Sequence, residues 1–114
     1  MRVYLPATLS ELASFVATGQ VPSGGDRYVA ADETDETEEA EYDALSEASD
    51  AAAELLDGPG RRVVLVADVP DPDAAFPISL LVAVHADTED VAPAAGDLPD
   101  LGWYAVQEIP DLVG

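Results

Sequence analysis

Cysteine and lysine are both absent from this chain of 114 residues. Without cysteine, disulfides, zinc-thiolate sites and cysteine nucleophiles are excluded. The one histidine, His85, is the only imidazole available for acid-base or metal chemistry. Long apolar runs are also lacking: the longest, residues 63–67 and 80–84, fall far short of the ~20 residues that cross a bilayer. We therefore expect no membrane-spanning segment.

The N-terminus does not have the continuous apolar core of a secretory signal. Pro6 and Glu11 interrupt the apolar residues that follow Arg2. We interpret this end as mature protein, and the lack of cysteine suits a cytoplasmic location.

The charge of the chain is nearly all of one sign. Twenty-four acidic residues stand against four arginines, which gives a formal net charge of -20. Phosphate backbones and anionic lipids repel such a chain, so we expect no direct binding to nucleic acid or to a membrane. Cationic partners or metal ions are favoured instead, while a role in solubility alone is the simpler interpretation. A GC-rich genome and a salt-adapted cytoplasm both explain the composition.

The most informative stretch is residues 61–70, RRVVLVADVP. Its β-branched residues form an unbroken apolar run between two turn signals, residues 58–60 (GPG) and 70–72 (PDP). A run of this kind is typical of a strand buried on both faces. We therefore predict that this stretch lies at the centre of a sheet.

The N-terminal part of the chain predicts a strand, a helix and a weaker strand. Residues 2–5 alternate in polarity and predict a short strand beside the central one. Thr8 or Ser10 can then cap a helix that ends at Gly19. Residues 27–31 (RYVAA) are a weaker strand candidate after a loop over residues 21–26. The predicted helix before Gly19 carries one apolar stripe, made of Leu9, Leu12, Phe15 and Val16.

Residues 32–50 hold ten of the acidic residues. Self-repulsion would keep residues 32–37 disordered as a free segment. From Glu38 the pattern changes to that of an amphipathic helix, which Gly58 and Pro59 end. The predicted apolar stripe consists of Leu45, Ala48, Ala52, Leu55 and Leu56.

Two further strands complete the expected fold, at residues 78–86 and 103–109. The short connection after the central strand favours antiparallel pairing with residues 78–86. We predict an α+β fold in one small domain, residues 1–114. Its architecture is a two-layer sandwich, a mainly antiparallel or mixed sheet of four to five strands with both helices on one face.

Three stretches resemble a family of short actinobacterial proteins of unknown function. They are the opening MRVYLPATL, the middle EYDALSEA with RRVVLVADVP, and the closing WYAVQEIPDL. The resemblance implies a cytoplasmic actinobacterial protein. It implies no activity, because the family has none assigned.

Three carboxylates near the end of the central strand are the weak candidates for a metal site. Asp68, Asp71 and Asp73 supply the oxygen ligands that Mg²⁺ and Ca²⁺ prefer, without the glycine and distal glutamate of a calcium loop. A solvated acidic loop is the competing interpretation. We predict no cofactor.

The catalytic candidates are equally sparse. Asp87 stands two residues after His85 and could orient its imidazole, but the nearest hydroxyl, Ser79, lacks a nucleophile elbow. We therefore interpret His85 as a structural histidine at a strand end and predict no catalytic residue. Residues 23–25 (SGG) have neither the lysine nor the spacing of a phosphate loop, so we interpret them as a turn.

The closing stretch is the best candidate for contact with a partner. Trp103 and Tyr104 are adjacent in a predicted strand and must point to opposite faces, so one ring can be exposed beside Gln107 and Glu108. A ring that caps the core is the competing interpretation.

We predict a non-catalytic module that acts by protein association, as a homodimer or with a basic partner. The alternative is a small metal- or ligand-binding protein or enzyme that uses the loop from Asp68 to Asp73. A third interpretation is mimicry of nucleic acid by the carboxylates of residues 35–54.

Overall fold

The computed structural model describes residues 2–29, 38–56, 58–92, 98 and 100–113. Five strands form one antiparallel sheet in the order β3-β1-β4-β6-β7, and β2 pairs with β5 in a second sheet. The strands are β1 (Arg2–Ala7), β2 (Gln20–Val21), β3 (Tyr28–Val29), β4 (Val63–Asp68), β5 (Phe76–Pro77), β6 (Leu81–Ala86) and β7 (Gly102–Tyr104). The helices are α1 (Leu9–Thr18), α2 (Glu38–Leu55) and α3 (Ile109–Val113), with 3₁₀ turns η1 (Ile78–Leu80) and η3 (Val106–Glu108). The predicted α+β class and antiparallel sheet are confirmed.

Strand β4 lies at the centre of the five-stranded sheet, as predicted. It pairs antiparallel with β1 on one side and with β6 on the other. Its residues alternate between two apolar clusters, one containing Val63 and Leu65 and the other Val64 and Val66. Because both faces of the strand are buried, every position from Val63 to Ala67 is apolar. The weak strand candidate also joins the sheet, since β3 pairs with β1 at the edge.

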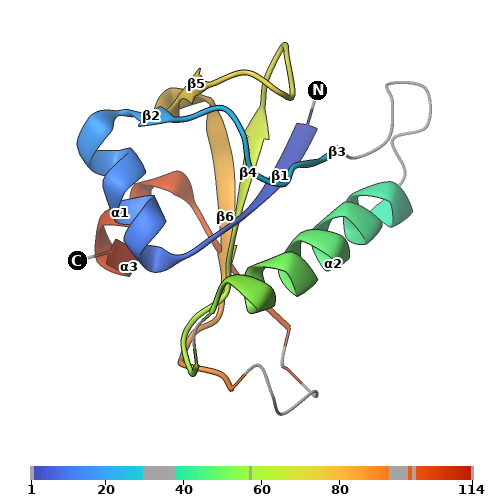
Figure 1. The fold of residues 1–114 in the computed structure, drawn as a ribbon, viewed down its shortest axis with the longest axis vertical. Coiled ribbons are helices and arrows are strands. Elements are labelled where there is room, and N and C mark those ends of the chain that lie inside the picture. The colour runs from blue at the N-terminus through green and yellow to red at the C-terminus, as the bar shows by residue number, and fades with distance from the viewer. Residues whose placement is uncertain (1, 30–37, 57, 93–97, 99, 114) are drawn as a thin grey trace.

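The prediction that both helices lie on one face is wrong. Leu12 of α1 packs in the cluster of Val63 and Leu65, whereas Ala48 of α2 packs in the cluster of Val64 and Val66. Figure 1 shows the sheet on edge, with α1 and α3 on one side and α2 on the other. The reason is physical: apolar side chains on both faces of β4 are removed from water only when each face is covered.

Helix α1 begins and ends where its sequence signals predict. Thr8 is the N-cap: its hydroxyl accepts from the Glu11 amide at 3.1 Å, and the Glu11 carboxylate accepts from the Thr8 amide at 3.0 Å. This reciprocal capping box satisfies two amides of the first turn. Gly19 ends the helix with φ at 78°, a conformation that glycine adopts without strain.

Helix α2 packs on β1 and β4 through alanines rather than through the predicted leucines. Ala48 and Ala52 are buried as expected, but Leu55 is exposed and Leu45 is only partly buried. Small side chains let the helix backbone approach the sheet closely, so Ala44 and Ala51 complete the buried stripe. The predicted disorder concerns residues 32–37, which lie outside the described residues.

The C-terminal stretch is a strand only at its start, so the prediction for residues 103–109 is partly wrong. Strand β7 ends at Tyr104, and the chain then turns through η3 into α3. Ile109 and Leu112, three residues apart on α3, pack in the same cluster as Leu12. Proline fits the first turn of a helix, which explains Pro110. Among the described helices, none combines the length and apolarity that a bilayer crossing requires.

Candidate functional site

The predicted metal candidate Asp68 is bound to arginine. Its two carboxylate oxygens accept from Nε and Nη2 of Arg2, each at 3.1 Å, across the β1–β4 pairing. The Nη1 atom of Arg2 donates to Glu41 of α2 at 3.1 Å. The hydrogen bonds from Arg2 lower the pKa of Asp68. This cluster ties the start of β1 and the end of β4 to α2 at the surface of the protein.

The other two metal candidates shape a turn. Oδ1 of Asp71 accepts from the backbone amide of Asp73 at 2.9 Å, and both residues are exposed. Within the part of the chain that the structure describes, no three acidic or imidazole groups are arranged to hold a metal ion. The geometry therefore gives the predicted site at Asp68, Asp71 and Asp73 no support.

His85 and Asp87 do not form the general-base pair that their spacing in the sequence allows. Both carboxylate oxygens of Asp87, which is only 1% exposed, accept from Arg62 instead. The imidazole of His85 is half-buried, and this burial lowers its pKa. Ser79 lies on η1, beyond the other end of β6. These residues do not make a catalytic arrangement.

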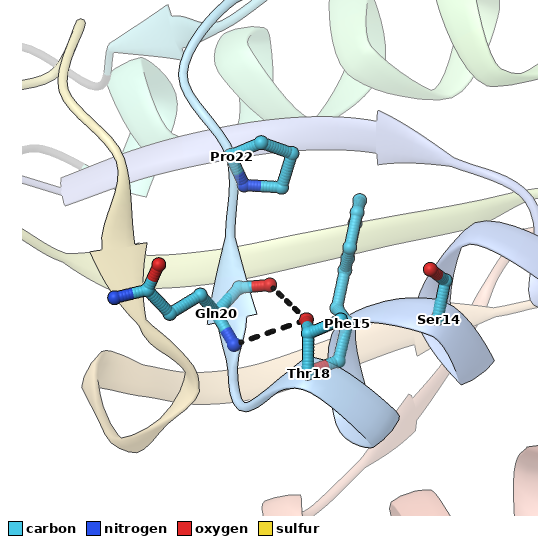
Figure 2. A pocket seen from close by; sticks show the side chains of 5 residues that line it. All are labelled: Ser14, Phe15, Thr18, Gln20 and Pro22. Carbon is cyan, nitrogen blue, oxygen red and sulfur yellow. Dashed lines mark hydrogen bonds between the residues drawn. The ribbon is translucent and has the colours of Figure 1, made fainter.

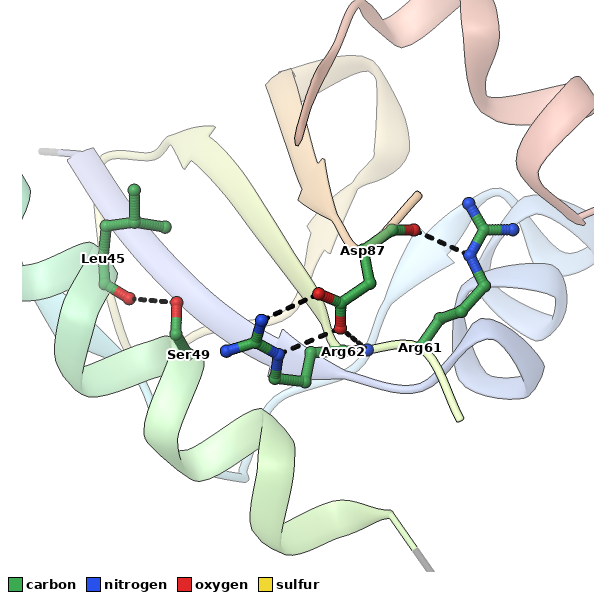
Figure 3. A network of polar contacts seen from close by, with 5 residues as sticks. All are labelled: Leu45, Ser49, Arg61, Arg62 and Asp87. Carbon is green, nitrogen blue, oxygen red and sulfur yellow. Dashed lines mark hydrogen bonds and ion pairs between the residues drawn. The ribbon is translucent and has the colours of Figure 1, made fainter. Parts of the chain in front are cut away.

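Arg62 and Asp87 form a buried ion pair that Figure 3 shows in detail. Oδ2 of Asp87 accepts from the backbone amide of Arg62 at 2.8 Å and from its Nε at 2.9 Å, while Oδ1 accepts from Nη2 at 2.7 Å. Arg61 donates through Nε to the Asp87 carbonyl at 2.7 Å. Because Arg62 precedes β4 and Asp87 follows β6, this ion pair joins the start of β4 to the end of β6.

All four arginines are engaged within the molecule. Arg27 donates to the carbonyls of Pro22, Pro72 and Ala74 at 2.7 to 2.8 Å, and its guanidinium lies 5.4 Å from the ring centre of Phe76.

Among the described residues, the carboxylates of Glu41, Asp68 and Asp87 form the ion pairs with arginine. The remaining described carboxylates therefore give the surface a strongly negative charge.

A hollow of about 240 Å³ lies beside α1 and β2 (Figure 2). The hydroxyl of Thr18 is used locally, since it lies 3.2 Å from the carbonyl oxygen of Gln20 and 3.3 Å from that of Phe15. The hollow is lined by Ser14, Phe15, Thr18, Gln20 and Pro22. None of these side chains ionises near neutral pH, so the hollow offers no acid-base chemistry.

The two aromatic residues of β7 point to opposite faces of the sheet, as predicted. Tyr104 is paired with Val84 and packs against the cluster under α1 and α3. Trp103 is paired with His85, which lies beside Val64 on the face that α2 covers. Trp103 is nevertheless 62% exposed, because α2 packs on β1, β3 and β4, towards the other edge of the sheet.

Leu101 completes this surface. It is partly buried and packs against the apolar cluster beneath α2, on the same face as Trp103. We call Trp103, His85 and Leu101 the Trp103 surface. Gln107 and Glu108 are exposed but lie on η3, and the Glu108 carboxylate accepts from the Ala105 amide at 2.9 Å. The prediction that they continue the strand beside Trp103 is therefore wrong.

Comparison with known proteins places the chain in a family. The model described as "Family of unknown function (DUF6912)" matches residues 1–113. The chain belongs to this family. No curated protein and no solved structure matches it. Membership in DUF6912 confirms the expected resemblance to a family of unknown function, and it brings no activity or site residue.

Sequence reasoning missed the Arg62–Asp87 pair of this DUF6912 protein, although a signal for it exists. Arg62 immediately precedes one strongly apolar strand and Asp87 immediately follows the next. If two such strands pair antiparallel, the start of the first lies beside the end of the second, so opposite charges there can meet.

Proposed function

We propose that this protein is a non-catalytic binding module and that the Trp103 surface recognises a positively charged protein partner. The observation that carries the proposal is the exposed indole of Trp103, which stands on an edge strand beside half-buried His85. Exposed tryptophans that can be desolvated by a partner are typical anchors of protein interfaces.

Charge supports a basic partner rather than a second copy of the chain. A net charge of -20 makes two copies repel, while it attracts a cationic protein and speeds their encounter. The lowered pKa of His85 also favours a basic partner, because it keeps the imidazole beside Trp103 neutral and a neutral imidazole does not repel a cation.

The test is a selection of random displayed peptides against the wild-type chain, followed by measurement of the affinity of each selected peptide. We expect selected peptides to be rich in arginine and lysine and to contain an apolar residue. Trp103→Ala should weaken their binding about 30-fold or more, the cost of removing an interface anchor. Trp103 is the only tryptophan, so its emission reports binding to the wild type.

The matched control is Val29→Ala, which removes an exposed apolar side chain from β3 at the opposite edge of the sheet. This variant should bind the selected peptides like the wild type. Equal affinity of the wild type and the Trp103→Ala variant would refute the proposal. So would light scattering that gives twice the 11.9 kDa of one chain for the wild type and 11.9 kDa for Trp103→Ala, since a second copy would then be the partner.

A further inference from the structure

Strand β7 forms one edge of the five-stranded sheet. Gly102, Trp103 and Tyr104 pair with β6 on one side, and in the sheet of described strands β7 has no neighbour on its other side. As the terminal strand of the described sheet, β7 can accept another extended chain by β-strand addition. The edge is short, so a partner strand must gain further affinity from side chains.

The charges around β7 indicate what kind of strand it would accept. Asp100 is exposed two residues before the strand, and Glu108 and Asp111 are exposed after it. Carboxylates therefore lie at both ends of the edge strand in the chain, and Trp103 lies at its middle. A strand that alternates basic with apolar residues matches this arrangement, because successive side chains of a strand point to opposite faces.

We infer that the basic partner binds as an extended segment that adds to β7 as a sixth strand, with an apolar side chain on Trp103. This inference rests on the proposed function and specifies the form of its partner. Backbone hydrogen bonds to β7 supply one part of the affinity, and the carboxylates and the indole supply the selectivity.

The opposite edge strand, β3, fits such a segment less well. It is only two residues long, and α2 packs against it. Its exposed Val29 offers a much smaller apolar contact than the indole of Trp103. Edge β3 therefore serves as the control.

The experiment uses two short, end-blocked peptides of the same composition. In one, arginine alternates with valine; in the other, the arginines form one block and the valines another. Both carry the same charge, which controls for electrostatic attraction. Only the alternating peptide presents all of its valines on one face of a strand. We expect the alternating peptide to bind the wild-type chain at least about tenfold more tightly, measured by fluorescence anisotropy of labelled peptide.

Backbone N-methylation then tests the strand pairing itself. In an extended peptide the valine amides point to one edge and the arginine amides to the other. Methylation of one set should weaken binding by about tenfold or more, because it removes the donors to β7, while methylation of the other set should leave binding near its original strength.

The outcomes separate the two proposals. If Trp103→Ala weakens binding of the alternating peptide but the two methylated forms bind equally well, strand addition is refuted and the proposed function stands. If Trp103→Ala has no effect on binding, the proposed function and strand addition are both refuted. They are also both refuted if the peptides bind neither the wild type nor the Trp103→Ala variant. Loss of binding in Val29→Ala with full binding in Trp103→Ala would assign the contact to β3 and refute both proposals.

Discussion

Replacement of Asp87 by asparagine tests whether the Arg62–Asp87 pair holds the end of the central strands together. The substitution keeps the shape of the side chain and one acceptor oxygen. It removes the negative charge opposite a guanidinium whose residue is only 6% exposed. It also replaces one of the two oxygens that accept from Arg62 with an amide group that can only donate.

The expected loss follows from burial. Removal of one partner of a buried ion pair costs about 3–5 kcal/mol, because the guanidinium of Arg62 loses an opposite charge and a hydrogen-bond acceptor in a medium of low polarity. Asparagine retains one acceptor, so we expect the lower end, about 3 kcal/mol. This is a large share of the roughly 5–15 kcal/mol by which a small domain is stable.

Urea denaturation measures the loss directly. With a slope of about 1.5 kcal/mol/M, a loss of about 3 kcal/mol lowers the midpoint by about 2 M. The matched control is Asp68→Asn, which breaks the exposed pair with Arg2 and should cost less than about 1 kcal/mol. If the two variants differ by less than about 1 kcal/mol, the reasoning from burial is refuted.

Two further predictions concern His85 and Thr8. Burial lowers the pKa of His85 below its ordinary 6.5, so the unfolded chain takes up a proton first as the pH falls below that value and the wild type loses stability. Because His85 is the only histidine, the loss in unfolding free energy between pH 7.5 and 5.5 should be larger for the wild type than for His85→Gln; equal losses would contradict the burial. Thr8→Ala should lower the unfolding free energy by about 1 kcal/mol through loss of the N-cap, whereas Thr8→Ser should preserve it, and equal midpoints for both variants in urea would contradict the capping role.

Local patterns account for most of the elements that the sequence predicts correctly. The apolar run of β4 requires burial on both faces, and this alone indicates a central strand. The bounds of α1 follow from Thr8 and Gly19, whose roles depend on residues within one turn of the helix. The candidate site is predicted in part: adjacency placed Trp103 and Tyr104 on opposite faces, but the exposed face depends on where α2 packs.

The tertiary structure decided the features that depend on contacts between distant residues. The partition of α1 and α2 between the two faces of the sheet is such a feature, because both helices are amphipathic and neither pattern specifies a face. The pairing of Asp87 with Arg62 rather than with His85 depends on strand register, which brings residues 25 apart in sequence into contact. Local patterns therefore specify the central strand, the bounds of α1 and the negative charge. Which side chains meet is specified by the antiparallel sheet, because register and packing arise only when the strands assemble.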